Sequence, residues 1–233
     1  MISLVSDTIN KDDFEKLIEW LKSYPRLTKG EKTIEFEKLF AKYIGSKYAV
    51  FCNSGSSANL LMLYSLIATK RLKNKKIVVP NLSWITDVAP IIQFGLEPIL
   101  CDVNLENLSV DLKHLEEIFI KEEPATLILV SVLGFSPHMD KILELCKKFN
   151  VICCEDVCES QGTEYKNKKL GSFGLMGTFS FYFAHLMSTI EGGMITTDDD
   201  EIYNYLLLLR SHGWLRDSTK EFNNKIKEKW DIS

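Results

Sequence analysis

The 233-residue sequence contains no uninterrupted apolar run of about 18 residues, the length expected of a membrane-spanning helix. Residues 1–7 lack the basic stretch and long apolar segment of a signal peptide. A net charge of −4 gives no basic excess for binding nucleic acid. The sequence also has no internal repeat and no low-complexity linker. We therefore expect a cytoplasmic globular protein that binds neither a membrane nor nucleic acid.

A metal site also finds little support. The Cys153-Cys154-x-x-x-Cys158 group has no second paired cluster at finger-like spacing. Because there is no export signal and the cysteines lie inside apolar runs, we expect buried free thiols in a reducing compartment. The cysteines are Cys52, Cys101, Cys146, Cys153, Cys154 and Cys158.

Helical and strand patterns alternate along the chain, and 45% hydrophobic residues suffice for the core of one large α/β domain. Helices are expected at residues 11–23, 31–43, 57–72, 84–94, 111–121, 138–149 and 201–212. Strands are expected at residues 48–52, 76–79, 97–101, 126–132 and 151–155. Continuous apolar strands separated by helices predict a mostly parallel sheet that helices flank on both faces. Residues 177–197 suggest a hairpin that turns near 188–192.

Four polar groups follow predicted strands, at the edge where open α/β sheets bind ligands. The first is Ser-Gly-Ser-Ser-Ala-Asn at 54–59, at a strand-to-helix junction. Its small residues let backbone N–H groups approach an anion, and a helix N-terminus adds partial positive charge. Serine-rich helix starts are also ordinary caps, so this segment alone leaves both interpretations open.

The second and third groups offer an aromatic ring and an acid. Trp84 follows the strand at 76–79 and could stack on a planar ligand, although on this residue alone a partly buried core aromatic is the favoured interpretation. Asp156 and Glu159 follow the apolar strand at 151–155. A buried carboxylate needs a cationic or donor partner, which a protonated ring nitrogen would provide. The alternative is an aspartate that caps the next turn.

The fourth group is Ser180 with His185. A hydroxyl suits a phosphate, and an imidazole exchanges protons near neutral pH, although a lone histidine is more often structural. Together the four groups offer a phosphate cup, a stacking ring, a partner for a ring nitrogen and a proton-transfer group. Pyridoxal phosphate needs this set.

On these residues the chain resembles the DegT/DnrJ/EryC1/StrS group of pyridoxal-phosphate sugar aminotransferases and dehydratases, over essentially its whole length. The matching stretches are residues 27–30 with Phe36-Glu37, 53–58, Glu155-Asp156 with Gly162, 180–193 and 210–213. The resemblance implies an α/β large domain of the aspartate-aminotransferase-like type, fold type I.

The resemblance also implies a role for each site residue. Trp84 would stack on the pyridine ring, and Asp156 would keep the ring nitrogen protonated, which makes the ring an electron sink. Glu159 stands where aminotransferases usually carry a glutamine near the ring hydroxyl. The cofactor phosphate would be bound by backbone and hydroxyl groups of Gly55, Ser56, Ser57 and Ser180.

His185 matches the position of the lysine that holds the cofactor covalently. An imidazole cannot form a Schiff base with an aldehyde, so the cofactor would be bound noncovalently and His185 would act as a base. This replacement, with His-Gly-Trp-Leu-Arg-Asp at 212–217, resembles the branch typified by GDP-4-keto-6-deoxy-D-mannose 3-dehydratase. The branch implies 3-dehydration of a nucleotide-linked 4-keto-6-deoxy hexose in deoxysugar biosynthesis. It also implies pyridoxamine phosphate, glutamate as amino donor, a GDP-linked substrate and a homodimer.

Three alternatives remain beside this activity. A nucleotide-sugar aminotransferase would need another lysine, and Lys168 and Lys169 are the nearest in sequence. A second lysine-less branch, the CDP-hexose 3-dehydrase, uses an iron–sulfur cluster, but the cysteines do not give its clustered spacing. A truncated, non-catalytic subunit that retains the fold is the third.

Members of the family have a smaller C-terminal domain and a Gly-Tyr-Asn-x-Arg-like segment that reaches the partner subunit's site; the segment is absent here. We expect residues 1–24 to form an N-terminal helical segment and residues 25–215 the cofactor-binding large domain. Residues 216–233 are expected to begin a C-terminal domain whose remainder is missing.

Overall fold

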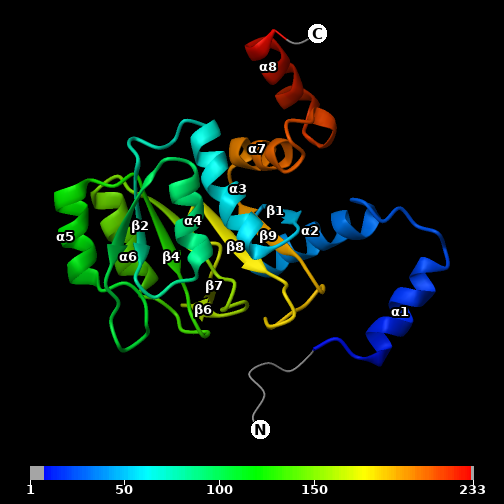
Figure 1. Ribbon diagram of the computed structural model, residues 1–233, viewed down its shortest axis with the longest axis horizontal. Helices are drawn as coiled ribbons and strands as arrows, with labels where there is room; N and C mark the ends of the chain where they lie inside the picture. The colour runs from blue at the N-terminus through cyan, green and yellow to red at the C-terminus, as the bar shows by residue number, and fades with distance from the viewer. Residues whose placement is uncertain (1–7, 232–233) are drawn as a thin grey trace.

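The computed structural model describes residues 8–231, and its centre is a seven-stranded sheet between two layers of helices (Figure 1). The strand order is β1-β9-β8-β5-β4-β2-β3. Neighbours from β3 to β8 run parallel, whereas β9 is antiparallel to both β8 and β1. The prediction of a mostly parallel sheet is therefore confirmed. The strands are β1 (Tyr48–Cys52), β2 (Lys76–Pro80), β3 (Glu97–Cys101), β4 (Thr126–Val130), β5 (Ile152–Asp156), β8 (Met176–Ser180) and β9 (Gly193–Thr197).

Each face of the sheet has its own apolar core. One core joins the strands to α2, α5 and α6 through residues such as Phe40, Leu115 and Ile142. The other joins them to α3, α4 and α7 through residues such as Met62 and Leu206. The sheet is therefore covered on both faces, which explains why its central strands are almost continuously apolar. The helices are α2 (Glu31–Ile44), α3 (Gly55–Ala68), α4 (Ile85–Gln93), α5 (Leu112–Glu122), α6 (Met139–Lys148) and α7 (Asp200–Arg210).

Helix α3 lies centrally, against β8, β9, α4 and α7. It begins at Gly55, two residues before the predicted start, because Ser54 is its N-cap: the Ser57 N–H donates to Ser54 Oγ at 3.1 Å. It ends at Ala68, earlier than the predicted residue 72. This cap fixes the start of α3 three residues after β1 ends.

The hairpin of β8 and β9 is present, but its connection was predicted too short. The loop covers residues 181–192 rather than turning near 188–192. Two backbone bonds close its base, from the Phe181 N–H to Gly192 O at 2.8 Å and from the Thr189 N–H to Phe181 O at 3.0 Å. A small hairpin of β6 (Glu164–Tyr165) and β7 (Lys168–Lys169) was not predicted, because two-residue polar strands show no periodicity.

The two ends of the described chain differ in packing. Helix α1 (Lys11–Leu21) buries no residue and stands away from the sheet in Figure 1. Helix α8 (Lys220–Trp230), which sequence periodicity did not identify, packs Phe222 and Ile226 against Tyr205 of α7. Residues 1–7 and 232–233 of the predicted terminal segments lie outside the described residues. Within residues 8–231, no helix has the length and apolar character to traverse a bilayer.

Candidate functional site

The start of α3 forms a place for an anion. Ser57 Oγ lies 3.1 Å from Ser54 Oγ, and the Ser57 N–H is satisfied by the same hydroxyl. The N–H groups of Gly55 and Ser56 belong to the first turn, so no carbonyl within α3 is positioned to accept from them. They are available to a phosphate, which the partial positive charge of the helix end also attracts.

Gly55 is placed where only a glycine fits. A Cβ added there would lie 2.7 Å from Ser180 Cβ and 2.9 Å from Cys158 Sγ. The backbone of Gly55 therefore packs closely against the side chains of Ser180 and Cys158. Gln161 holds the backbone of Ser180 in place, because its Nε2 donates to Ser180 O at 2.6 Å.

Asp156 ends β5 and is 4% exposed. Its Oδ1 accepts from the Cys158 N–H at 2.9 Å, and its Oδ2 accepts from Asn59 Nδ2 at 2.7 Å. Asn59 is oriented in turn by the Thr178 hydroxyl, which donates to Asn59 Oδ1 at 2.7 Å. Both donors to Asp156 are neutral, so they orient its carboxylate without neutralising the charge.

A second buried carboxyl group, Asp87 of α4, was not predicted. Asn59 Nδ2 donates to Asp87 Oδ1 at 3.1 Å, and the Trp84 N–H donates to Asp87 Oδ2 at 3.2 Å. Burial, followed by repulsion from Asp156, raises the pKa of Asp87 to about 10. The sequence did carry a signal for Asp87, since it is the one charged residue between Lys76 and Glu97.

His185 lies half-buried in the loop between β8 and β9. Burial lowers the pKa of its imidazole, and the carboxylates of Glu159 and Asp156 partly oppose that shift. The imidazole is therefore within electrostatic range of both acids. Its backbone N–H donates to Tyr182 O at 3.0 Å, which fixes the loop turn that carries it. A neutral imidazole beside two acids can accept and return a proton near pH 7.

Glu159 and Trp84 are the remaining predicted site residues. Glu159 Oε2 accepts from the Leu133 N–H at 3.1 Å, which ties the segment after β5 to the loop after β4. Trp84 precedes α4 and is 68% exposed, so its indole is open to a planar ligand rather than packed in the core. Its link to the acids is the backbone bond to Asp87.

The two lysines considered for covalent chemistry are engaged elsewhere. Lys169 Nζ pairs with Glu164 Oε1 at 3.0 Å across the β6–β7 hairpin. Lys168 Nζ lies 4.6 Å from the centre of the Phe173 ring. Neither contact involves Asp156 or His185. Within residues 8–231, no three histidine, cysteine or acidic side chains gather closely enough to hold a metal ion.

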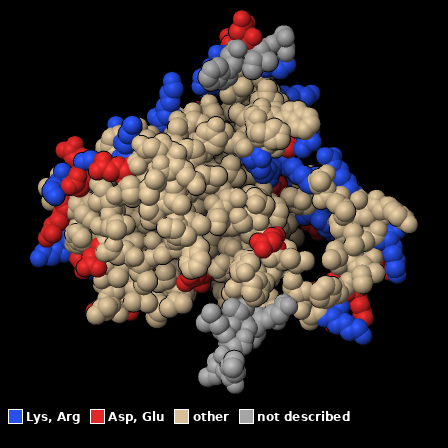
Figure 2. Space-filling view, viewed as in Figure 1, with Lys and Arg blue, Asp and Glu red and all other residues tan. Residues whose placement is uncertain are grey.

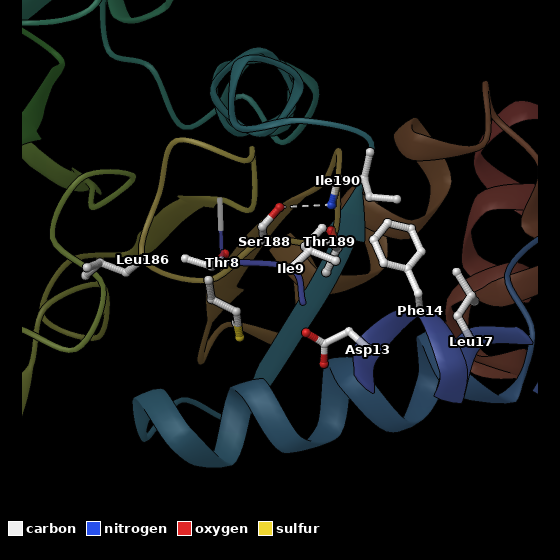
Figure 3. Close-up of a pocket in the computed structure, with 10 residues that line it drawn as sticks. Thr8, Ile9, Asp13, Phe14, Leu17, Leu186, Ser188, Thr189 and Ile190 are labelled. Carbon is white, nitrogen blue, oxygen red and sulfur yellow. Dashed lines mark hydrogen bonds between the residues drawn. The ribbon is translucent and has the colours of Figure 1, made fainter. Parts of the chain in front are cut away.

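An open groove of about 440 Å³ lies beside the loop that carries His185 (Figure 3). It runs between the start of α1 and residues 186–190, and Phe14, Leu17 and Asp13 of α1 form part of its lining. Leu186 contributes to its lining, but His185 and Asp156 do not.

Comparison with known proteins places this geometry in a family. The chain matches the DegT/DnrJ/EryC1/StrS aminotransferase family over residues 7–229. It is 42% identical to the GDP-4-keto-6-deoxy-D-mannose 3-dehydratase of Escherichia coli O55:H7 over 219 residues, 92% of this chain and 56% of that protein.

Two solved structures are also similar. The E. coli GDP-4-keto-6-deoxy-D-mannose-3-dehydratase with bound hydrated PLP has a TM-score of 0.89 and 40% identity, and the match covers 94% of this chain and 57% of that one. A GDP-4-keto-6-deoxymannose-3-dehydratase with a trapped PLP-glutamate geminal diamine has a TM-score of 0.86 and 38% identity, with the same coverage of both chains. The chain thus spans little more than half the length of these relatives. It belongs to the DegT/DnrJ/EryC1/StrS aminotransferase family.

Proposed function

We propose that this chain is the cofactor-binding part of a pyridoxal- or pyridoxamine-phosphate enzyme that removes the C3 hydroxyl of a nucleotide-linked 4-keto-6-deoxy hexose. The observation that carries the proposal is His185, which lies half-buried beside the acids Asp156 and Glu159. A histidine at this place provides a base but no amine for covalent attachment. The 42% identical relative, a 3-dehydratase, supports the same reaction.

The residues present fit this cofactor. Asp156 is a buried carboxylate with only neutral donors, so a protonated ring nitrogen would complete its partners. Gly55 lies close to Ser180 at the N-terminus of α3, which suits a phosphate, and Ser56 and Ser57 belong to the same first turn. Trp84 is open to stack on the ring. When bound, the cofactor would supply an amine that condenses with a ketone and a ring that accepts electrons.

The protein's own contribution would then be positioning and proton transfer. Asp156, held by Asn59 and the Cys158 N–H, would fix the ring and its protonated nitrogen. A ring nitrogen of His185 would accept a proton beside the reacting carbon and return one later, because burial keeps the imidazole neutral near pH 7. Glu159, near the ring hydroxyl in the family pattern, would orient that edge of the cofactor.

The substrate and partners follow from the relatives. A GDP-linked sugar is proposed because the similar dehydratase acts on GDP-4-keto-6-deoxy-D-mannose, and glutamate as amino donor because a similar structure holds a PLP-glutamate adduct. We also propose a cytoplasmic homodimer in which residues 25–215 form the cofactor-binding domain, flanked by the segments 1–24 and 216–233. All six cysteines are free thiols, as a reducing compartment requires.

Borohydride reduction tests the carrying observation. The chain is incubated with pyridoxal phosphate and reduced, and intact mass with peptide mapping locates any adduct. The expected result is no adduct in the pocket of the wild type and one reduced adduct in the matched variant His185→Lys. A stable adduct on a pocket lysine of the wild type would contradict the proposal.

An aminotransferase is the second candidate, because the family as a whole carries that description. Incubation with glutamate and a 4-keto nucleotide sugar separates the two activities. Ammonia with a deoxy sugar supports dehydration, whereas an amino sugar supports transfer. A monomer that takes up no pyridoxal phosphate would refute both, and would favour a non-catalytic subunit.

A further inference from the structure

Two buried carboxyl groups share one amide donor in the site. Asn59 Nδ2 donates to Asp156 Oδ2 at 2.7 Å and to Asp87 Oδ1 at 3.1 Å. Asp87 is fully buried, and Asp156 is 4% exposed. The proposed function gives Asp156 a role but leaves Asp87 without one.

Two adjacent carboxylates cannot both be charged when they are buried without a cation. The titratable groups that interact with the pair are Glu159, Cys158 and His185, and Cys52 lies beside Cys158. Glu159 is a third acid. Burial raises the pKa of both thiols and lowers that of the imidazole, so all three groups are neutral near pH 7. The surroundings therefore provide no positive charge for a second carboxylate.

We propose, on the basis of the proposed function, that Asp87 is a positioning residue that remains a neutral acid and donates a hydrogen bond to Asp156. The acid pair would then carry one negative charge, which matches the single positive charge of a protonated ring nitrogen. Asp87 also accepts from the Trp84 N–H at 3.2 Å, so the same side chain fixes the residue that would stack on the ring. Asp87 thus links Asp156, the proposed partner of the ring nitrogen, to Trp84, which would stack on the ring.

The raised pKa of Asp87, about 10, agrees with this assignment. The simpler alternative is that Asp87 is an ordinary ionised residue in the first turn of α4, where a negative charge is favourable. The two differ in whether the folded protein holds an extra proton, which can be measured without the cofactor.

The first arm compares stability against pH for the wild type and Asp87→Asn. Asparagine keeps an acceptor for Trp84 and a donor towards Asp156 but has no proton to lose. Because the pKa of Asp87 is raised on folding, stability is greatest at low pH and falls as the pH rises towards 10. The wild-type unfolding constant, relative to Asp87→Asn, should rise about tenfold per pH unit between about pH 6 and 8.

Asp102→Asn, which removes an exposed carboxyl group, is the matched control and should follow the wild type. Parallel profiles for the wild type and Asp87→Asn would overturn the proposal. This arm remains decisive even if the chain binds no cofactor.

The second arm titrates each protein with pyridoxamine phosphate and follows tryptophan fluorescence. Asp87→Asn should bind within about threefold of the wild type. Asp87→Ala, which leaves the Trp84 N–H without its partner, should bind at least about tenfold more weakly. Asp87→Ser replaces the alanine variant if that does not fold. An asparagine variant as weak as these would overturn the proposal, whereas a wild type that fails to bind would refute the proposed function instead.

Discussion

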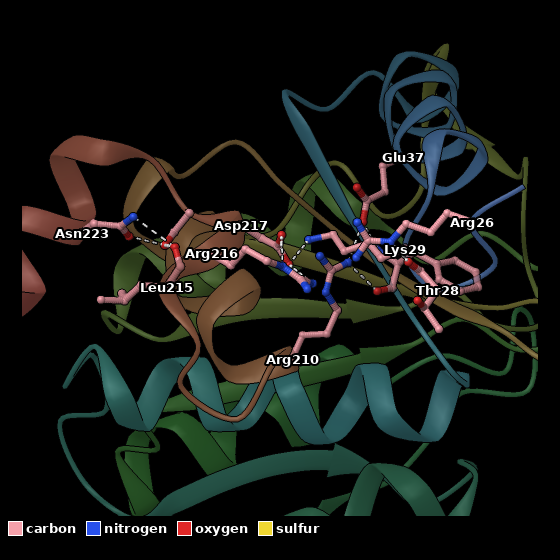
Figure 4. Close-up of polar contacts among 11 residues, drawn as sticks. Arg26, Thr28, Lys29, Glu37, Arg210, Leu215, Arg216, Asp217 and Asn223 are labelled. Carbon is pink, nitrogen blue, oxygen red and sulfur yellow. Dashed lines mark hydrogen bonds and ion pairs between the residues drawn. The ribbon is translucent and has the colours of Figure 1, made fainter.

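The buried pair of Glu37 and Arg210 offers the sharpest test of how the site's framework is held together (Figure 4). Arg210 Nη1 lies 2.6 Å from Glu37 Oε1 and donates to Phe51 O at 2.7 Å. Glu37 Oε1 also accepts from the Phe51 N–H at 2.9 Å. These contacts join α2 and α7 to β1, the strand that precedes the N-terminus of α3.

Replacing Glu37 by glutamine should destabilise the fold by about 3–5 kcal/mol, the usual cost of removing one partner from a buried ion pair. Both side chains are only 12% exposed, so water cannot replace the lost carboxylate. Arg210 Nη2 is already buried without a partner. The repulsion of Lys29 by Arg210 would also lose Glu37, one of the two carboxylates that oppose it, and only Asp217 would remain. The free energy of unfolding in urea is the measurement.

The matched control is Glu35→Gln, at an exposed pair in which Lys32 Nζ lies 2.7 Å from Glu35 Oε2. Because side chains more than half exposed are well solvated, this change should cost at most about 1 kcal/mol. The double variant Glu37→Leu with Arg210→Met should be less destabilised than Glu37→Gln, since it leaves no unpaired buried charge. Equal small losses for Glu37→Gln and Glu35→Gln would refute the reasoning.

Three further changes test other parts of the structure. Gly55→Ala should weaken pyridoxal-phosphate binding at least about tenfold in an absorbance titration, because its Cβ would lie 2.7 Å from Ser180 Cβ; unchanged affinity would show that the phosphate lies elsewhere. Glu155→Gln should cost about 1–3 kcal/mol in urea unfolding, because the Gly171 N–H, 2.8 Å from Glu155 Oε2, would lose its acceptor, and a loss below about 0.5 kcal/mol would argue against that role. Because burial lowers the pKa of His185, its imidazole should titrate with a midpoint below pH 6.5, and the proposed dehydratase activity should fall as the imidazole becomes protonated. An NMR titration with a midpoint above 6.5 would contradict this.

The elements of the sheet could largely be read from periodicity. Strands such as β1 and β3 and helices such as α2 and α4 begin or end within about one or two residues of their predicted positions. The errors fall where hydrophobic periodicity gives no information. The Ser54 cap moved the start of α3, and the loop at 181–192 is closed by backbone bonds that leave no mark in the sequence.

The candidate site also has features that the sequence predicts and features that it does not. Asp156 and Ser180 could be chosen as candidates because polar residues at the carboxyl ends of parallel strands meet at one edge of the sheet, and Gly55 because its backbone N–H opens a helix. The roles assigned to them came from resemblance to a family and remain proposals.

What the sequence determined by itself was the order of the elements and the chemical types available at the sheet edge, because both follow from local pattern. Only the tertiary structure decided that Asn59 lies between Asp87 and Asp156, residues 28 and 97 positions away from it in the chain. The fold also sets the pKa of Asp87, which burial and repulsion from Asp156 raise. Local pattern carries no information about such neighbours, because their distance is set by how the helices pack on the sheet.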